Sequence, residues 1–359
     1  MPVIWAAISG HGYGHAAQVV PVLNALGRLV PELSVLLRTT VPIEFFRDRL
    51  MVPWTRQSVL QDVGCIQRGP LEIDVRGTWE ALRAFHRSWD ERLAQEVRDM
   101  QAVAPRLILA DTPYLACAAG AAAGIPTIGL ANFTWNEVLA QLTEGEAPDF
   151  QTFLAHMHEQ YRQGTRALRI TPGLPLSSYK NVVDIGPIAE PAPSQRHEVR
   201  QALALEDHAN LVLVGFGGIA LESLPWDCME RMRHYRFLVD GTLPRTMSNV
   251  HSTSSLPFTF KTLLASVDAV MTKPGYGTTV EAVALGTPVV YVRRFNFADE
   301  APLVDFLETH GKAVELSRAD FSSGHWEPAL TALEEKRPRK PAPTCSGAQD
   351  AARLLAPYF

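Results

Sequence analysis

The segment Met271-Thr272-Lys273-Pro274-Gly275-Tyr276-Gly277-Thr278-Thr279-Val280-Glu281 gives the strongest indication of the fold. It follows a short apolar run at 267–270 and continues into Ala282-Val283-Ala284-Leu285-Gly286-Thr287-Pro288-Val289-Val290-Tyr291. This order predicts a strand, a glycine-rich turn, a short helix and a second strand. Gly275 and Gly277 let the backbone approach a phosphate, and the start of the helix offers free N–H groups and a positive dipole end.

Two charged side chains flank this turn. Glu281 lies one turn into the expected helix, where a carboxylate can bind the two hydroxyls of a ribose. Lys273 precedes the turn and can neutralise a departing pyrophosphate. The alternative for Lys273 is a solvated lysine in a surface turn. Together with the two glycines, these residues predict a pocket for a nucleotide diphosphate.

The composition is that of a soluble globular protein. A chain of 359 residues with 47% hydrophobic residues predicts two domains, each with its own core. A net charge of −5 argues against a nucleic-acid-binding protein, which would carry a basic face. Four cysteines without Cys-x-x-Cys spacing favour reduced thiols in a cytoplasmic protein. The apolar run at the N-terminus is shorter than a signal peptide requires, and no apolar run reaches about 18 residues, so neither a signal peptide nor a membrane span is expected.

Two segments of the chain begin in the same way. Val3–Ile8 is typical of an apolar strand, and it ends at the loop Ser9-Gly10-His11-Gly12-Tyr13-Gly14-His15. Near the middle, a strand at 211–214 leads into Gly215-Phe216-Gly217-Gly218. Two segments that each begin with a strand, a glycine turn and a helix predict two doubly wound parallel-sheet α/β domains. Further buried strands are expected at 34–38, 107–110, 127–131, 168–171, 236–239, 269–271, 289–292 and 313–315.

The domain boundaries are expected at two loose segments. The first domain is predicted to span 1–185 and the second 186–336, because Asp184-Ile185-Gly186-Pro187-Ile188 leads into a stretch rich in Ala, Glu, Pro and Ser. Residues 337–359 form a linker and a closing helix. The basic, proline-rich stretch at 336–343 is interpreted as a solvated linker, with an anionic membrane contact as the alternative.

His15 is the strongest candidate for a catalytic base. It lies where the first glycine loop meets its helix, at the sheet edge where open α/β folds bind ligands. A neutral imidazole there can remove a proton from an attacking hydroxyl. Asp111 directly follows the strand at 107–110 and is the candidate to orient His15. The alternatives are a helix-capping histidine and an N-cap of the helix at 114–123. His11, with Gly12 and Gly14, is better placed for substrate contact.

Asp299 and Glu300 follow a strand and can accept hydrogen bonds from sugar hydroxyls. Equally, Asp299 could cap a helix at 300–309. A stripe of apolar residues within Gly77–Met100, with basic residues interleaved, is expected in the core, with an acceptor-binding surface as the alternative. No Asp-x-Asp occurs in the sequence, which weakens the case for a divalent metal at a sugar-nucleotide site.

These motifs resemble those of glycosyltransferases with the GT-B fold, over both halves of the chain. The segment from Ser266 to Glu300 is similar to the donor-nucleotide motif of plant and bacterial UDP-glycosyltransferases and of the N-acetylglucosaminyltransferase of peptidoglycan synthesis. Three stretches are closer still to the glycosyltransferase-like N-terminal region of plant L-arabinokinases. They are Gly10-His11-Gly12-Tyr13-Gly14-His15-Ala16, Ala131-Asn132-Phe133-Thr134-Trp135 and the segment from Tyr276 to Pro302. The chain carries no recognisable sugar-kinase domain, so the likeness does not imply kinase activity.

The resemblance implies roles for the donor-side residues. Gly275, Gly277 and Thr278 fall on the diphosphate loop, and Glu281 falls on the ribose-binding glutamate. Lys273 stands where many relatives have a phosphate-binding histidine. The turn that holds Gly217 and Gly218 is assigned to the same nucleotide.

The resemblance also implies roles on the acceptor side and for the sugar. It places His15 at the catalytic base and Asp111 at its orienting acid. Asp299 matches a sugar-contacting aspartate, whereas Glu300 replaces a common glutamine. The GT-B fold implies two Rossmann-like domains that face each other across a donor cleft, with a C-terminal helix that crosses back onto the first domain.

We therefore predict an inverting, metal-independent glycosyltransferase of the hexosyltransferase type. It would move a sugar from a nucleotide sugar, expected to be UDP-linked, to an acceptor hydroxyl, without a further cofactor. The alternatives are a nucleotide-sugar hydrolase or 2-epimerase of the same fold, and a non-catalytic nucleotide-sugar-binding protein. In a hydrolase, His15 could activate water.

Overall fold

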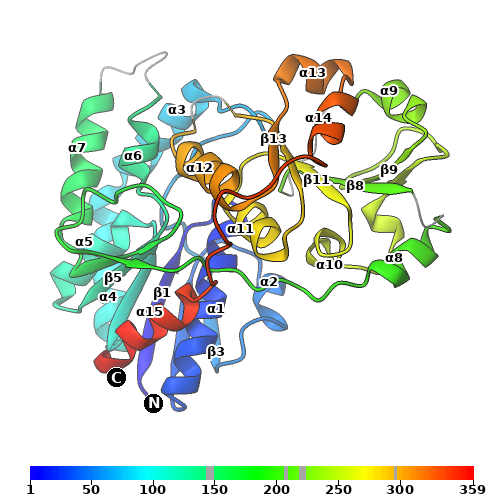
Figure 1. The fold of residues 1–359 in the computed structure, drawn as a ribbon. Helices are drawn as coiled ribbons and strands as arrows, with labels where there is room; N and C mark the ends of the chain where they lie inside the picture. The colour runs from blue at the N-terminus through cyan, green and yellow to red at the C-terminus, as the bar shows by residue number, and fades with distance from the viewer. Residues whose placement is uncertain (143–148, 206–208, 218–223, 295–296) are drawn as a thin grey trace.

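The computed structural model describes residues 1–142, 149–205, 209–217, 224–294 and 297–359. Two sheets of parallel strands organise the chain into two α/β domains (Figure 1). The first sheet has seven strands in the order β3-β2-β1-β4-β5-β6-β7, and the second has six in the order β10-β9-β8-β11-β12-β13. Helices cover both sheets, so the predicted fold class of two doubly wound domains is confirmed.

The N-terminal domain contains the strands β1 (Val3–Ile8), β2 (Ser34–Arg38), β3 (Trp54–Gln57), β4 (Leu107–Asp111), β5 (Thr127–Ala131), β6 (Arg166–Ile170) and β7 (Val182–Ile185). Its helices are α1 (Gly14–Leu29), α2 (Glu44–Arg47), α3 (Val75–Arg87), α4 (Trp89–Val103), α5 (Tyr114–Ala123), α6 (Trp135–Leu139) and α7 (Phe150–Tyr161).

The C-terminal domain contains the strands β8 (Asn210–Val214), β9 (Tyr235–Val239), β10 (Val250–Ser252), β11 (Ala269–Thr272), β12 (Val289–Tyr291) and β13 (Ala313–Glu315). Its helices are α8 (Arg196–Ala202), α9 (Trp226–Arg231), α10 (Phe260–Leu264), α11 (Tyr276–Leu285), α12 (Glu300–His310), α13 (Arg318–Ser323) and α14 (Glu327–Ala332). The last helix is α15 (Gly347–Leu355), and two single 3₁₀ turns lie at Thr253–Ser255 and Ala356–Tyr358.

All the strands expected from apolar runs are present, and the three that were missed lie at sheet edges. β3, β7 and β10 each pair on one side only. Central parallel strands are covered on both faces and therefore have continuous apolar sequences, as in Leu107–Asp111. β3 instead alternates half-buried and exposed residues, and it contains an arginine and a glutamine. An edge strand of this composition carries a weak sequence signal.

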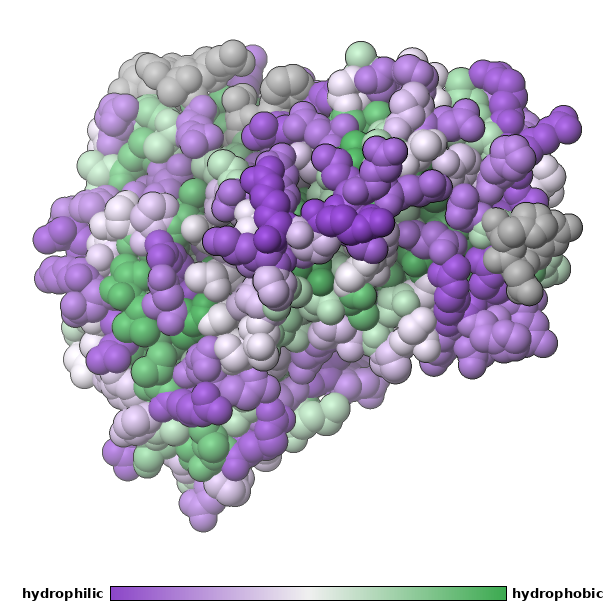
Figure 2. All heavy atoms as spheres, viewed as in Figure 1, coloured by the Kyte–Doolittle hydropathy of each residue, from purple (hydrophilic) through white to green (hydrophobic). Residues whose placement is uncertain are grey.

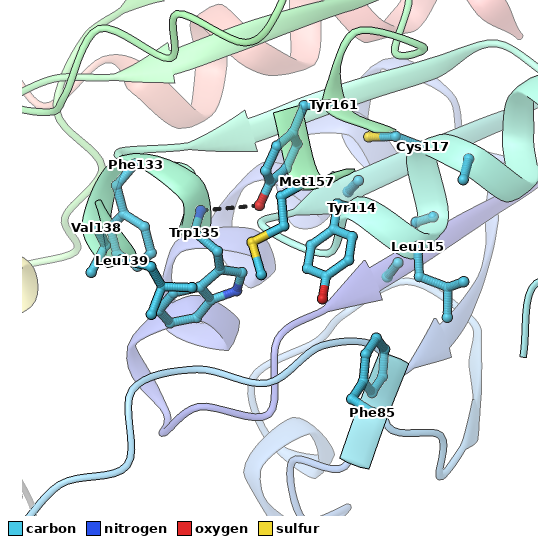
Figure 3. Close-up of a cluster of buried hydrophobic side chains, with 14 of the residues drawn as sticks. Phe85, Tyr114, Leu115, Cys117, Phe133, Trp135, Val138, Leu139, Met157 and Tyr161 are labelled. Carbon is cyan, nitrogen blue, oxygen red and sulfur yellow. Dashed lines mark hydrogen bonds between the residues drawn. The ribbon is translucent and has the colours of Figure 1, made fainter. Parts of the chain in front are cut away.

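The apolar stripe within 77–100 belongs to the core, as expected, but it is divided between two helices. α3 ends and α4 begins at Ser88. Trp79 and Phe85 are almost fully buried. They belong to a hydrophobic core cluster that also includes residues of α5 and α7, and Figure 3 shows part of this cluster. In that view, the backbone N–H of Trp135 donates to the hydroxyl of Tyr161 at 3.1 Å, which joins α6 to α7.

The C-terminal helix α15 packs against α1 of the first domain (Figure 1). Four apolar residues of α15 lie in the first domain's core: Ala348, Ala351, Ala352 and Leu355. The backbone N–H of Gly347 donates to the carbonyl of Pro187 at 3.0 Å. A Cβ atom on Gly347 would lie 2.0 Å from the carbonyl oxygen of Gly186, so the crossing requires glycine at this position. The last residues of the chain are therefore fixed to the first domain.

The basic segment before α15 lies along the end of α12. The backbone N–H of Lys340 donates to the carbonyl of Thr309 at 2.9 Å, and Arg339 pairs with Glu308 at 3.4 Å. Figure 2 shows hydrophilic surface across the middle of this face, where α12 and this segment lie in Figure 1. Among the described residues, no helix combines the length and the apolar composition that a membrane crossing needs.

Candidate active site

The first half of the site forms where β1 and β4 end side by side. Ile8 and Asp111 are partners in the parallel register, so the loop after β1 starts beside Asp111. His15 is the second residue of α1, and its Nδ1 lies 3.2 Å from Oδ1 of Asp111. Both side chains are buried, with 7% of His15 and 1% of Asp111 exposed. The structure thus brings together the two residues that the sequence singled out as base and orienting acid.

The capping alternatives for these two residues are wrong. Asp111 is the last residue of β4, and the N-cap of α5 is Pro113. His15 lies inside α1, whose N-cap is Tyr13. The side chains of His15 and Asp111 therefore serve each other, and neither closes the end of a helix.

Charge around His15 favours its protonated form. Burial opposes protonation, but the charge and hydrogen bond of Asp111, with further attraction from Asp62 and Asp299, raise the pKa of His15 above its usual 6.5. Asp111 accepts at Nδ1, and no described residue hydrogen-bonds to Nε2. Nε2 is therefore the ring nitrogen that can take a proton from a substrate.

His11 has the opposite electrostatic character. Burial, with repulsion from His15 and Lys273, lowers its pKa to about 4, so its ring is neutral near pH 7. Its Nε2 lies 3.3 Å from Nε2 of Gln67. The neighbouring Gly12 and Gly14 are exposed, and Gly12 has a positive φ of 83°. No described atom lies within 4 Å of a Cβ built on either glycine, so this loop has room beside it.

Sequence reasoning missed Asp62, a second buried acid near His15. Its Oδ2 accepts from the indole N–H of Trp135 at 2.7 Å, and its Oδ1 accepts from the hydroxyl of Ser9 at 2.9 Å. Burial raises the pKa of Asp62 above its usual value, against these hydrogen bonds and the attraction of His15. Asp62 lies in an irregular segment between β3 and α3, with no periodic pattern or motif that could have indicated it.

Thr112, next to Asp111, has an unfavourable backbone conformation. Its φ is +67°, a region that β-branched residues rarely adopt. The hydroxyl of Tyr161 donates to the carbonyl of Thr112 at 2.6 Å, and the Thr112 hydroxyl lies 3.3 Å from Oδ2 of Asp62. Strain of this kind persists only where the surroundings hold it. Here the constraint fixes the direction of the chain as it leaves Asp111.

The second half of the site is the glycine turn between β11 and α11. Lys273 is only 9% exposed and makes no hydrogen bond or ion pair with the residues that the structure describes. Burial, with repulsion from Arg294, lowers its pKa to about 8. Its alternative as a solvated surface lysine is therefore wrong. A buried ammonium group without a protein partner is a ready site for an anion.

Two glycines lie beside the Lys273 side chain. Gly217, in the turn after β8, has a φ of +74°, and a Cβ built there would lie 3.5 Å from Cε of Lys273. A Cβ on Gly275 would lie 4.0 Å from the same atom, and Gly277 has no described atom within that range. Gly218, also predicted to contact the nucleotide, lies outside the described residues. The backbone is therefore accessible at the start of α11, where N–H groups are free to bind an anion.

Two further donor-side candidates lie on α11. Thr278 is half-buried in the first turn of the helix. Glu281 is buried, and its Oε1 lies 2.7 Å from Nζ of Lys261. Burial raises the pKa of Glu281, with Lys261 acting in the opposite direction. Lys261 contacts one carboxylate oxygen of Glu281, which leaves the other oxygen for the proposed contact with a ribose.

Glu300 and Asp299 differ in how far other side chains engage them. The carboxylate of Glu300 accepts from Nε of Arg293 at 2.9 Å and from the backbone N–H of Arg294 at 2.7 Å. Both oxygens are used and the residue is 3% exposed, which favours a structural role over the predicted sugar contact. Asp299 stands at the N-cap of α12 but makes no capping hydrogen bond within the described chain. Its carboxylate lies 3.4 Å from Nη2 of Arg294.

Asp299 links the two halves of the site. Its charge attracts both His15 and Lys273, and Lys273 in turn repels His11. Beside it, Ala298 is buried in the same core cluster as Trp135 and Tyr114 of the first domain. The loop between β12 and α12 thus brings the Lys273 side of the second domain to the His15 side of the first.

Solved structures with the same architecture are glycosyltransferases. The glycosyltransferase of kitacinnamycin matches with a TM-score of 0.65 and 15% identity, over 100% of this chain and 99% of that chain. UGT2 of Phytolacca americana, solved with UDP-2-fluoroglucose and pterostilbene, matches with a TM-score of 0.64 and 16% identity, over 99% and 94%. The chain has the GT-B fold. At these identities, the likeness establishes the fold alone.

The protein that the chain resembles in sequence is a plant enzyme. L-arabinokinase of Arabidopsis thaliana is 27% identical over 340 residues, which are 92% of this chain and 32% of the relative. The chain therefore spans about a third of the length of that relative. No family model matches the chain. The likeness to GT-B glycosyltransferases and to L-arabinokinase, inferred from short motifs, is thus confirmed over nearly the whole chain.

Proposed function

We propose that this protein is an inverting glycosyltransferase that uses a nucleotide sugar, with UDP as the expected nucleotide. One observation supports this most strongly. A buried His15–Asp111 pair in the first GT-B domain and a buried Lys273 in the second, unpartnered within the described chain, are both influenced by the charge of Asp299 at the junction of the domains. The first group can accept a proton, and the second can receive the anion that leaves.

The proposed reaction is a single displacement. The acceptor hydroxyl gives its proton to Nε2 of His15 as its oxygen attacks the anomeric carbon of the donor. The bond between that carbon and the diphosphate oxygen breaks, and the electron pair leaves with the nucleotide. Lys273 and the N–H groups at the start of α11 stabilise the new negative charge, so we propose that no divalent metal is needed. Attack from the opposite face inverts the anomeric centre.

Structures of similar fold support a nucleotide-sugar donor. UGT2 of Phytolacca americana was solved with UDP-2-fluoroglucose, and the spinosyn rhamnosyltransferase SpnG was solved with thymidine diphosphate. Both ligands carry the nucleoside diphosphate that we assign to Lys273 and Gly275. For this chain, the acceptor is proposed only as a compound with a reactive hydroxyl.

Transfer from a panel of UDP- and TDP-sugars to a panel of hydroxyl acceptors tests the proposal, with EDTA present throughout. We expect product with at least one pair, and loss of that product in His15→Ala while calorimetric UDP affinity is kept. The exposed His197 on α8 supplies the control His197→Ala, which should stay active. Unchanged turnover in His15→Ala would remove His15 from the mechanism, and cleavage of the donor without an acceptor would indicate a hydrolase.

A further inference from the structure

Asp62 reaches the site on a loop that is held from two sides. On one side, the Gln61 side chain donates to Oε1 of Glu96 at 2.5 Å, and Glu96 forms a buried ion pair with Arg38. On the other side, a Cβ on Gly64 would lie 2.4 Å from the ring of His11. A loop this tightly packed fixes the position of the acid between its anchors.

The polar groups around Asp62 come from three segments at the carboxyl end of the same sheet. Ser9 follows β1, Thr112 follows β4, and Trp135 begins α6 after β5. Ser9 and Trp135 donate to the carboxylate at 2.9 and 2.7 Å. The Thr112 hydroxyl lies 3.3 Å from it and makes its shorter hydrogen bond, of 2.8 Å, to the carbonyl of Asp111. A carboxylate that accepts several hydrogen bonds can remain ionised despite burial. These hydrogen bonds oppose the effect of burial, which raises the pKa of Asp62, and they favour its ionised form.

That charge acts on His15 and on its surroundings. The charged and titratable groups that face His15 are Asp111, Asp62, Asp299 and His11. Among the three acids, Asp111 contacts the ring directly. Asp62 instead holds Trp135, whose ring lies 6.1 Å from the ring of His15 and 5.3 Å from that of His11. Asp62 therefore holds the indole that lies beside both His15 and His11.

We propose that Asp62 is a positioning carboxylate of the proposed transferase site, which supports the imidazolium of His15 by its charge and holds Trp135 against the ring. The proposal rests on the proposed function and adds a second acid to the His15–Asp111 pair. His15 then works between two carboxylates, one that orients Nδ1 and one that stabilises the charge formed when Nε2 takes the proton.

Asp62→Asn tests this directly, because the amide keeps the shape and can still accept from Trp135. NMR titration of His15, assigned by its loss in His15→Ala, should show a pKa lowered by about one unit, a tenfold change in proton affinity. The acidic limb of kcat/KM should move down by the same amount, with UDP affinity unchanged. The control Asp184→Asn removes a carboxylate that pairs with Arg169 on β6, and it should change neither quantity.

A second variant separates charge from packing. Trp135→Phe keeps the Asp62 charge and an aromatic ring, so the acidic limb of kcat/KM should stay near its wild-type pH. The value of kcat should fall, because the indole that Asp62 holds beside His15 is lost. An unchanged His15 pKa in Asp62→Asn would overturn the proposal, and so would a limb that moves only in Trp135→Phe. The NMR titration needs no turnover, so its result is independent of whether a transfer reaction is found.

Discussion

The neutral form of His15 is the form that accepts a proton, so transfer should fail as the pH falls through the pKa of this residue. Burial lowers that pKa, but Asp111 and the more distant acids raise it above 6.5 overall. We expect an acidic limb in kcat/KM above pH 6.5. Asp111→Asn should move the limb to lower pH and reduce kcat by roughly 10²-fold or more. A limb that stays in place would show that Asp111 does not control His15.

Lys273 predicts a second pH dependence, at the alkaline end. Its pKa is lowered to about 8, mainly by burial, and only the charged form attracts a diphosphate. UDP affinity measured by calorimetry should therefore fall as the pH rises through about 8, and binding near that pH should take up a proton.

Lys273→Ala should weaken UDP binding by about 1.5–3 kcal/mol at pH 7, the usual range for a hydrogen bond to a charged group. It should also abolish the alkaline dependence. The exposed Lys180 provides the matched control Lys180→Ala, with no change expected. An alkaline limb that persists in Lys273→Ala would assign it to another group.

The turn between β11 and α11 can be tested separately from the stability of the fold. A Cβ on Gly275 would meet its nearest described atom at 4.0 Å, which is ordinary contact. Gly275→Ala should therefore change the free energy of unfolding by no more than about 0.5 kcal/mol. UDP affinity should nevertheless fall, because the methyl group occupies the space assigned to the phosphate. Unchanged affinity would show that the phosphate does not approach this backbone.

Elements with strong local signals could be predicted, and elements without them could not. The apolar runs that became β4 and β11 are buried on both faces, so their composition alone identifies them. The glycine turns after β1 and β11 mark the carboxyl ends of the strands in the two sheets, where His15 and Lys273 lie. The position of Asp62 depends on tertiary contacts with Ser9 and Trp135, distant in the chain, and no local pattern records them.

Contacts between residues that are distant in the chain also explain why the ion pairs of some candidate residues were not predicted. Lys261 and Glu281 are 20 positions apart, and they meet because α10 and α11 contribute to the same hydrophobic cluster. Glu300 was chosen for its place after a strand, a rule that does not decide whether the nearby Arg293 and Arg294 pair with this carboxylate or with a phosphate. Sequence patterns therefore selected the candidate residues and the His15–Asp111 pair, whereas the contacts of Asp62 and the pairing of Glu281 with Lys261 required the three-dimensional structure.

At the junction of the domains, Tyr276 joins the donor turn to the first domain. Its hydroxyl accepts from the backbone N–H of Ile188 at 2.9 Å and donates to the carbonyl of Thr171 at 3.1 Å. Tyr276→Phe should lower the free energy of unfolding by about 1–3 kcal/mol, because it leaves two backbone groups without their partner. Tyr13→Phe, at an exposed tyrosine, is the control. Equal urea midpoints for the two variants would contradict this link.

The proposed reaction depends on one placement: the diphosphate of the donor lies at Lys273 and the start of α11, with the sugar directed toward His15. A crystal structure with a UDP-sugar analogue bound tests it most directly. We expect the diphosphate within hydrogen-bond distance of the Lys273 ammonium and the backbone N–H groups after Gly275, with the anomeric carbon toward Nε2 of His15. A diphosphate bound elsewhere, or a sugar directed away from His15, would contradict the proposed reaction.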